Sequence, residues 1–297
     1  MSPRVSVVLP VYNGERFVEA AIRSVLAQTM EDLELVVVDD GSTDATSTLV
    51  KSVEERRIRY IHQASQGPAA ARNRGLAECR SDLVAFIDAD DEWLPCKVSK
   101  QLALISPGRV VYSDVLFWDE STSTSIGGYE LFDRFPAEHE KFSGNILRGL
   151  LSQNIVHPST VMAWRDDLLG QGGFDRRLRV AEDWDLWLRL SEEYDFLRSD
   201  SPLALVRRRD DSHGSDRRAI VRDSVSVLLA ARDRLSARGE LDDSGRFAVA
   251  LGYFGVRAHA RAWAALGVAL LRRPWSLARW RWMLASLVRP LLRGWRS

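Results

Sequence analysis

The stretch Leu83-Val84-Ala85-Phe86-Ile87-Asp88-Ala89-Asp90-Asp91 places an apolar run directly before a cluster of acids. A short, continuous apolar run predicts a strand that is buried on both faces. Asp88 and Asp90, just beyond that strand, offer oxygen ligands to a divalent cation such as Mn²⁺ or Mg²⁺. The alternative is a solvated turn, because aspartate is common in loops and caps. The neighbouring Asp91 and Glu92 favour the cation, since crowded like charges are costly without one.

The same pattern recurs towards the N-terminus. Residues 5–9, 34–38 and 57–61 are further strand-like runs, and helical periodicity follows them from Glu15, from about Asp44 and from Pro68. Alternating strands and helices predict an open α/β sheet, whose ligands lie at the carboxyl ends of the strands. Asp39-Asp40, after the second strand, and the acids after residue 87 are therefore expected to share one crevice.

The rest of the chain predicts a strand over residues 110–117 and a helix that begins near Glu182. A polar and basic stretch over residues 207–218 separates these from two helical segments, residues 220–238 and 246 to the end. We therefore expect a catalytic domain over residues 1–215 and a helical C-terminal region over residues 216–297.

Composition excludes several classes of protein. Hydrophobic residues make up 45% and charged residues 28% of the chain, which is typical of a globular protein. Basic and acidic residues balance at 41 each, so bulk charge does not favour nucleic acid as a partner. Cys79 and Cys96 are too few for a disulfide framework, which indicates a reducing compartment. The first residues lack the pattern of a signal peptide, and residues 262–271 fall short of the roughly 20 needed to span a bilayer. We expect a cytoplasmic protein.

Other polar residues have a functional and a structural interpretation. Asp39 and Asp40 suit hydrogen bonds to a nucleobase or ribose, or alternatively a helix cap. Arg72, in the helix opened by Pro68, suits diphosphate oxygens, or alternatively a surface salt bridge. Glu182-Asp183 would be favoured electrostatically at any helix start, but a carboxylate there, Asp183, can also act as a general base.

Together these motifs resemble glycosyltransferase family 2, whose members have the GT-A fold, over residues 1–215. The stretches that carry the resemblance are Val5-Ser6-Val7-Val8-Leu9-Pro10-Val11-Tyr12-Asn13-Gly14, Val38-Asp39-Asp40-Gly41-Ser42-Thr43-Asp44, Ala71-Arg72-Asn73-Arg74-Gly75-Leu76, Phe86-Ile87-Asp88-Ala89-Asp90-Asp91, Gly173-Phe174-Asp175 and Ala181-Glu182-Asp183. The resemblance implies an α/β fold with a mixed sheet flanked by helices and followed by a C-terminal helical extension.

The resemblance also implies roles for individual residues. Pro10, Tyr12 and Asp40 would line the nucleoside site, with Asp39 beside it, and Asp88 would approach the ribose or sugar of the donor. Asp90 would be the principal metal ligand, Asp183 the catalytic base, and Asp91 and Glu182 their acidic neighbours. His157 would lie near the acceptor and the donor sugar, and His213 in a basic loop that closes on the diphosphate.

These assignments imply a metal-dependent, inverting transfer of a sugar from a nucleotide-diphosphate donor, by default a uridine diphosphate sugar. The acceptor would be a hydroxyl of a saccharide or lipid-linked molecule in cell-surface polysaccharide or glycoconjugate biosynthesis. A phosphatase of the haloacid dehalogenase type and a nucleotidylyltransferase fit the motifs poorly. The remaining alternative is an inactive sugar-nucleotide-binding or scaffolding module, against which the presence of both Asp90 and Asp183 argues.

The C-terminal tail carries a separate signal. From Leu271 onward, arginines alternate with tryptophans and no acid occurs. Such a composition suits an anionic membrane surface, here the inner face of the cell membrane. A helical hairpin that packs on the catalytic domain is an equally good interpretation.

Overall fold

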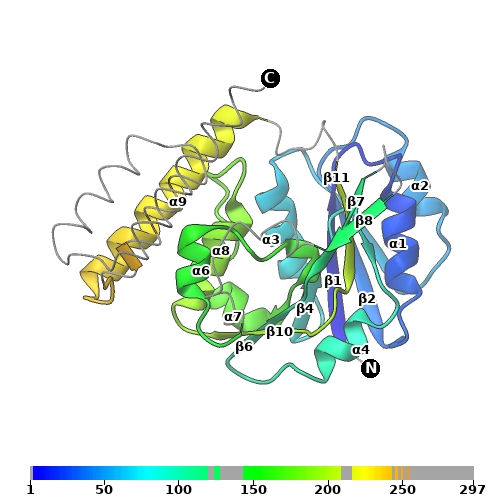
Figure 1. The fold of residues 1–297 in the computed structure, drawn as a ribbon. Coiled ribbons are helices and arrows are strands. Elements are labelled where there is room, and N and C mark those ends of the chain that lie inside the picture. Colours follow the sequence, from blue (N-terminus) through cyan, green and yellow to red (C-terminus); the bar gives the residue numbers. More distant parts are fainter. Residues whose placement is uncertain are drawn as a thin grey trace.

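The computed structural model describes residues 3–119, 124–127, 143–208 and 216–242, together with residues 245, 246, 249 and 253 (Figure 1). Its elements in chain order are β1 (Val5–Val11), α1 (Val18–Leu26), β2 (Leu33–Asp39), α2 (Thr46–Ser52), β3 (Ile58–His62), α3 (Pro68–Glu78), β4 (Leu83–Phe86), β5 (Glu92–Trp93), α4 (Lys97–Leu102), β6 (Arg109–Tyr112), β7 (Val115–Asp119), β8 (Thr124–Gly127), α6 (Leu147–Ser152), the 3₁₀ helix η2 (Pro158–Thr160), β9 (Met162–Trp164), α7 (Arg165–Gly170), α8 (Glu182–Ser191), β10 (Asp195–Arg198), β11 (Ala204–Arg208) and α9 (Arg217–Ala237).

The strands form two sheets. The larger has the order β10-β6-β9-β4-β1-β2-β3, and the smaller has the order β5-β11-β7-β8. In the larger sheet β4, β1, β2 and β3 run parallel to one another, whereas β9 is antiparallel to both of its neighbours. The expected mixed α/β sheet with helices on both faces is thus confirmed.

Side-chain alternation along β1 divides the core into two layers. Val5, Val7 and Leu9 pack with α1, α2 and α4 on one face of the sheet. Val8 points to the other face, where α3, α6, α7 and α8 form the second layer (Figure 1). Both layers are apolar, which explains why β1 carries hydrophobic residues on both faces; the one polar residue within it, Ser6, is buried and donates to Glu34.

Helix α3 lies unusually close to the sheet. A Cβ atom at Gly75 would come within 2.4 Å of Val8 Cγ1, so any other residue there would force the Val8 side chain or the helix to shift. Pro68 begins this helix, as predicted from its missing N–H. The close approach brings the first turn of α3, with Arg72, over the carboxyl end of the sheet.

The prediction of one strand over residues 110–117 is wrong. The segment divides at Ser113-Asp114 into β6 of the larger sheet and β7 of the smaller one. Ser113 Oγ donates to the Asp114 carbonyl at 2.8 Å, and the Val115 N–H donates to Asp114 Oδ1 at 2.7 Å. These local bonds occupy groups that a continuous strand would use in its ladder, and the chain changes sheets beside the site.

Helix α9 belongs to the region that the sequence predicts to be a separate helical part. Its Val225 and Leu228 lie in the same buried cluster as Trp184 and Leu188 of α8. The division after residue 215 itself falls outside the described residues and stays a prediction. The Arg-Trp tail from Leu271, and nearly all of the helix predicted from Arg246, also lie outside them. No described helix is both long and apolar enough to cross a bilayer.

Candidate active site

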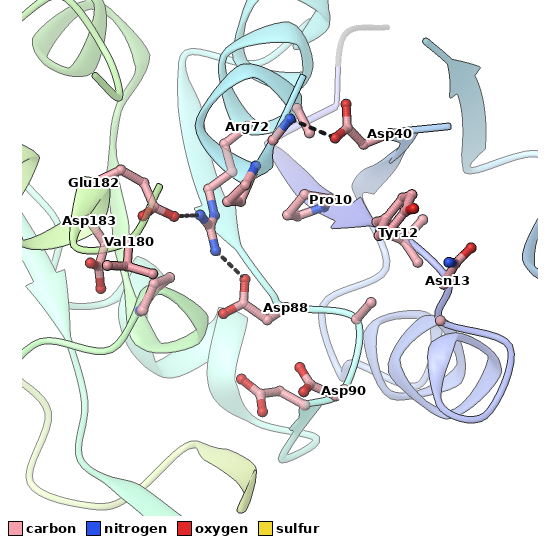
Figure 2. A pocket seen from close by; sticks show the side chains of 18 of the residues that line it. Pro10, Tyr12, Asn13, Asp40, Arg72, Asp88, Asp90, Val180, Glu182 and Asp183 are labelled. Atoms are coloured by element: carbon pink, nitrogen blue, oxygen red, sulfur yellow. Dashed lines mark hydrogen bonds and ion pairs between the residues drawn. The ribbon is translucent and has the colours of Figure 1, made fainter. Parts of the chain in front are cut away.

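A cavity of about 850 Å³ is lined by residues at the carboxyl ends of β1 and β4 and at the starts of α3 and α8; Figure 2 shows side chains that line it. The predicted site residues that line it are Pro10, Tyr12, Asp40, Arg72, Asp88, Asp90, Asp91, His157, Glu182 and Asp183. Asp39 is fully buried and does not line the cavity, and His213 lies outside the described residues. The shared crevice predicted from the strand ends is therefore present.

Arg72 joins the two acidic sides of the cavity. Its guanidinium donates to Asp88 Oδ1 at 2.6 Å and to Glu182 Oε1 at 2.5 Å (Figure 2). The side chain is buried and stacks on the ring of Phe174, 5.5 Å from its centroid. Burial by itself would raise the pKa of Asp88, but the charge and hydrogen bond of Arg72 oppose it, and that pKa is lowered. Arg72 thus forms a salt bridge in the interior rather than at the surface.

Asn73, the residue after Arg72 in helix α3, holds the segment over residues 173–174. The Asn73 side chain accepts from the Phe174 N–H at 2.9 Å and donates to the Phe174 carbonyl at 2.7 Å. Phe174 in turn packs edge-on against Phe86 and Trp187. Two stretches that carried the family resemblance therefore meet here in one structural unit.

Asp183, in the first turn of α8, has a carboxylate suited to proton transfer. Asn154 donates to its Oδ2 at 2.9 Å, and the Trp184 N–H donates to its Oδ1 at 2.7 Å. Burial, then the charge of Glu182, raise the pKa of Asp183 from 3.8 to about 6, although Arg72 opposes the shift. A carboxylate with a pKa close to neutral is well matched to general-base work.

The loop that carries Asp91 is held by the segment around η2. Ser159 Oγ donates to Asp91 Oδ2 at 2.5 Å and accepts from the Asp88 N–H at 3.0 Å. Burial, then Asp88 and Asp90, raise the pKa of Asp91 well above its ordinary value. Burial also lowers the pKa of His157, which favours the neutral imidazole. The acids at this position are therefore crowded without full compensation.

The same loop offers a set of metal ligands. Ligand atoms of Asp88, Asp91 and His157 lie within 4.8 Å of one another. Asp90, the ligand implied by the resemblance, lines the same cavity but lies outside that group of described side chains. Carboxylate oxygens and a neutral imidazole, crowded as they are here, fit a divalent cation.

Asp39 and Asp40 both hold neighbouring loops. Asp39 accepts two hydrogen bonds, from the Tyr60 hydroxyl at 2.5 Å and from the Ser42 N–H at 2.8 Å. Burial would raise the pKa of Asp39, but the hydrogen bonds from Tyr60, Ser42 and His62 lower it. Asp40 accepts from the N–H groups of Gln66 and Gly67 at the start of α3, where the helix dipole favours an anion. Tyr12, by contrast, is 51% exposed at the edge of the cavity.

Sequence reasoning missed three residues that position this site: Asn154, Ser159 and Asp223. Asp223, a buried residue of α9, accepts from the N–H groups of Arg179 and Val180 at 2.9 and 3.2 Å. The next residue, Ala181, has a left-handed φ of 63°, which is strained for alanine and must be held by its surroundings. No local pattern marks Asn154 or Asp223, whereas Ser159 lies two residues after His157, which the resemblance places near the acceptor.

Comparison with known proteins gives a consistent result. The sequence model described as "Glycosyl transferase family 2" matches residues 6–168. An uncharacterized glycosyltransferase of Rickettsia felis is 32% identical over 206 residues, which are 69% of this chain and 33% of that protein. The uncharacterized glycosyltransferase EpsJ of Bacillus subtilis is 42% identical over 93 residues, 31% of this chain and 27% of the relative. The matched segment spans 33% of the Rickettsia felis relative and between 27% and 61% of the other curated relatives compared.

Solved structures share the fold at lower identity. S. aureus TarS 1–349 in complex with UDP-GlcNAc has a TM-score of 0.60 at 20% identity, covering 86% of this chain and 73% of that one. The mannosyltransferase PcManGT from Pyrobaculum calidifontis, in complex with GDP-Man and Mn²⁺, has a TM-score of 0.59 at 19% identity, covering 98% of this chain and 88% of that one. At such identities the likeness establishes the GT-A fold.

Proposed function

The chain belongs to glycosyltransferase family 2, and from that membership we propose that it is an inverting, metal-dependent enzyme. It transfers a sugar from a nucleotide-diphosphate donor, by default a uridine diphosphate sugar, to a hydroxyl of a saccharide or lipid-linked acceptor. The proposal includes a hexosyl or N-acetylhexosaminyl donor and a role in cell-surface polysaccharide or glycoconjugate biosynthesis. The donors named in the TarS and PcManGT complexes, UDP-GlcNAc and GDP-Man, belong to this class.

The position and pKa of Asp183 carry the proposal. Pro10 and Tyr12 lie on one side of Asp88 and Asp183 lies on the other (Figure 2). A nucleoside bound by Tyr12 and Pro10 would place its diphosphate near the acids and its sugar towards Asp183. With a pKa of about 6, Asp183 is ionised at neutral pH and can take a proton from an attacking hydroxyl.

The reaction that these positions support is a direct displacement. The acceptor oxygen forms a bond to the anomeric carbon of the sugar while the bond from that carbon to the diphosphate oxygen breaks. The acceptor proton passes to Asp183, and the nucleoside diphosphate leaves with the electron pair. Attack from the face opposite the leaving group inverts the anomeric configuration.

The acidic loop would hold the cation. Asp90, together with Asp88, Asp91 and His157, presents the oxygen and nitrogen ligands suited to Mn²⁺ or Mg²⁺. A cation bound there would neutralise the charge that develops on the leaving diphosphate. Arg72 keeps Asp88 ionised and fixed in direction, and Ser159 orients Asp91.

Two further parts of the proposal concern regions outside the described residues. His213 would lie in a loop that closes on the diphosphate, and the tail from Leu271 would attach the enzyme to an anionic membrane from the cytoplasmic side. We retain the division into a catalytic unit over residues 1–215 and a helical region over residues 216–297.

The test is a donor screen. Nucleoside diphosphate release is measured from a panel of UDP-, GDP- and TDP-sugars with Mn²⁺ or Mg²⁺, using wild-type protein and Asp183→Asn. We expect release from at least one donor by the wild type and a large loss in the variant. If no donor is turned over while nucleotides still bind, the chain is an inactive sugar-nucleotide-binding module instead.

A further inference from the structure

Helix α4 begins with a lysine, Lys97, whose side chain is fully buried. Its Nζ donates to Gln101 Oε1 at 2.5 Å and lies over the ring of Trp93, 4.0 Å from the centroid. Among the residues that the structure describes, no carboxylate pairs with this amine, and burial lowers the pKa of Lys97 well below its ordinary value. An amine is costly to bury, so an apolar side chain would be expected here unless the amine has a task.

The contact with Gln101 decides which way the amide of this side chain faces. Gln101 is fully buried, and its Nε2 donates to the Thr160 carbonyl at 2.6 Å. A glutamine amide has a donor end and an acceptor end of nearly the same shape. Because Lys97 binds the acceptor end, the donor end is turned towards Thr160. Without the amine, the buried Oε1 would lose this partner, which costs free energy, and the amide could reverse.

Trp93 makes a second contact with the same segment. Its Nε1 donates to the Ser159 carbonyl at 2.8 Å, next to the carbonyl that Gln101 binds. An N–H group over the face of an indole is attracted by the ring, so Lys97 holds the plane of the indole as well as the amide. Two successive carbonyls of η2 are thus bound by two donors, and Lys97 contacts both donors.

The segment held in this way carries the hydroxyl that binds the acidic loop. Ser159 Oγ accepts from the Asp88 N–H at 3.0 Å and donates to Asp91 Oδ2 at 2.5 Å. Asp88, Asp91 and His157 are the described side chains whose ligand atoms are grouped closely enough to share a cation. Direct contacts therefore connect the buried amine, through the two donors and η2, to these ligands.

We propose that Lys97 is a positioning residue that sets the affinity of the acidic loop for a divalent cation. It acts through the side chains of Trp93 and Gln101, which fix η2 and thereby the carboxylates that η2 orients. The inference rests on the metal site of the proposed function and adds a residue that is not among its ligands. Removing a group that orients metal ligands typically lowers metal affinity by about 10- to 100-fold.

The test measures binding of Mn²⁺ to the full chain, alone and with UDP, by electron paramagnetic resonance of the free ion. Lys97→Met keeps the length of the side chain and removes the amine. We expect the Kd for Mn²⁺ to rise about tenfold or more. Lys100→Met is the matched control, because it makes the same change in the same helix at an exposed position, where Nζ contacts Ser201 Oγ. Its Kd should equal that of the wild type.

A second variant tests the contacts through which Lys97 would act. Trp93→Phe keeps an aromatic face under the amine but removes the Nε1 donor to the Ser159 carbonyl, so it should also raise the Kd for Mn²⁺. Combined with Lys97→Met it should raise the Kd by less than the product of the two single effects, because both changes act on the same segment. If Lys97→Met does not fold, Trp93→Phe decides alone, and an unchanged Kd there overturns the inference.

The outcomes separate this inference from the proposed function. Equal Mn²⁺ affinities of wild type and Lys97→Met overturn the positioning role and leave the metal site standing. Thermal unfolding without metal measures stability separately: a lower Tm with an unchanged Kd also overturns the role, because the lysine then only stabilises the fold. If the wild type binds no Mn²⁺, with or without UDP, the proposed metal site fails and the inference fails with it.

Discussion

Arg72 and Glu182 form a buried ion pair, 2.5 Å between Nη1 and Oε1, that joins helix α3 to the first residue of helix α8. The pair fixes the direction of Glu182, so this carboxylate faces the guanidinium, whereas the adjacent Asp183 faces Asn154. Removing one partner of such a buried pair typically costs about 3–5 kcal/mol. The two neighbouring acids therefore differ: Glu182 is held in an ion pair with Arg72, whereas Asp183 has a raised pKa, as the proposed base requires.

Replacing the base should abolish transfer but not binding. Asp183→Asn preserves the shape of the side chain and can still accept from Asn154, but it cannot take a proton. We expect turnover to fall by about 10²- to 10⁴-fold, with donor affinity measured by calorimetry nearly unchanged. Glu182→Gln keeps a hydrogen-bond acceptor for Arg72 and should retain more activity. The assignment is wrong if the Glu182 variant loses transfer while the Asp183 variant keeps it.

The pH dependence should follow the raised pKa of Asp183. Since the base must be ionised, kcat should fall below pH 6. The acid limb of the pH–rate profile should have its midpoint at the Asp183 pKa of about 6. In Glu182→Gln the limb should move to lower pH, because the charge that raises this pKa is removed and Arg72 loses an anionic partner. A limb that stays in place in the variant would contradict the assignment.

The same shift has a defined sign for stability. The folded protein holds the Asp183 proton more tightly than the unfolded chain does, since the pKa rises from 3.8 to about 6. This contribution to the free energy of unfolding is complete below pH 3.8 and is lost as the pH rises through 6. Denaturant titrations at several pH values across this range give the free energy of unfolding of wild type and of Asp183→Asn. This free energy should change less with pH in the variant.

Nucleotide binding should depend on a divalent cation held by the acidic loop. Asp90→Ala should weaken Mn²⁺-dependent binding of UDP and remove turnover, because a ligand of the cation is lost. Asp82→Ala, an exposed aspartate just before β4, is the matched control and should bind normally. Full wild-type activity in EDTA would exclude the metal role.

Asp223 should affect catalysis from outside the cavity. Asp223→Ala leaves the N–H groups of Arg179 and Val180 without their acceptor, so the strained Ala181 and the base after it become less well placed. We expect kcat to fall about tenfold or more, with a smaller change in the KM for the donor. Asp233→Ala, an exposed position on the same helix, provides the comparison. Similar kcat values for the two variants would exclude this positioning role.

The tail can be tested by truncation. Removing residues 271–297 takes away the arginine-tryptophan segment, so binding to liposomes that contain phosphatidylglycerol should weaken, because the basic side chains attract anionic headgroups. UDP affinity should stay the same. Co-sedimentation with anionic and with phosphatidylcholine liposomes measures the difference. If the shortened chain unfolds instead, the tail is a hairpin packed on the catalytic domain.

The sequence predicts the centre of this site well because its residues lie directly after strands. Asp40, Asp88 and Asp90 follow apolar runs, and the carboxyl ends of parallel strands must meet at one edge of the sheet. The order of the motifs points to Asp183, which lines the same cavity; its role as base stays a prediction. These predictions need only the residues next to a strand, or the rule that parallel strands end at the same edge of a sheet.

The parts that escaped prediction depend on contacts between distant segments. Nothing in the helix that contains Arg72 indicates that it is buried between Asp88 and Glu182, since that depends on how α8 packs. Asp223 meets the loop before Asp183 only after α9 has docked on α8. The break at Ser113-Asp114 was missed because side-chain bonds to the backbone, which periodicity does not detect, interrupt an otherwise apolar run.

The hydrogen bonds from the loop before Ala181 to Asp223 also imply an order in which parts of the site form while the chain is being synthesised. A nascent chain that has emerged as far as residue 215 contains every described residue that lines the large cavity, but not the carboxylate that holds this loop. Because domains fold progressively as they leave the ribosome, the sheet and its acids can assemble before the base is fixed in position. The proposed base would therefore be held in its final position only once α9 is made and docked.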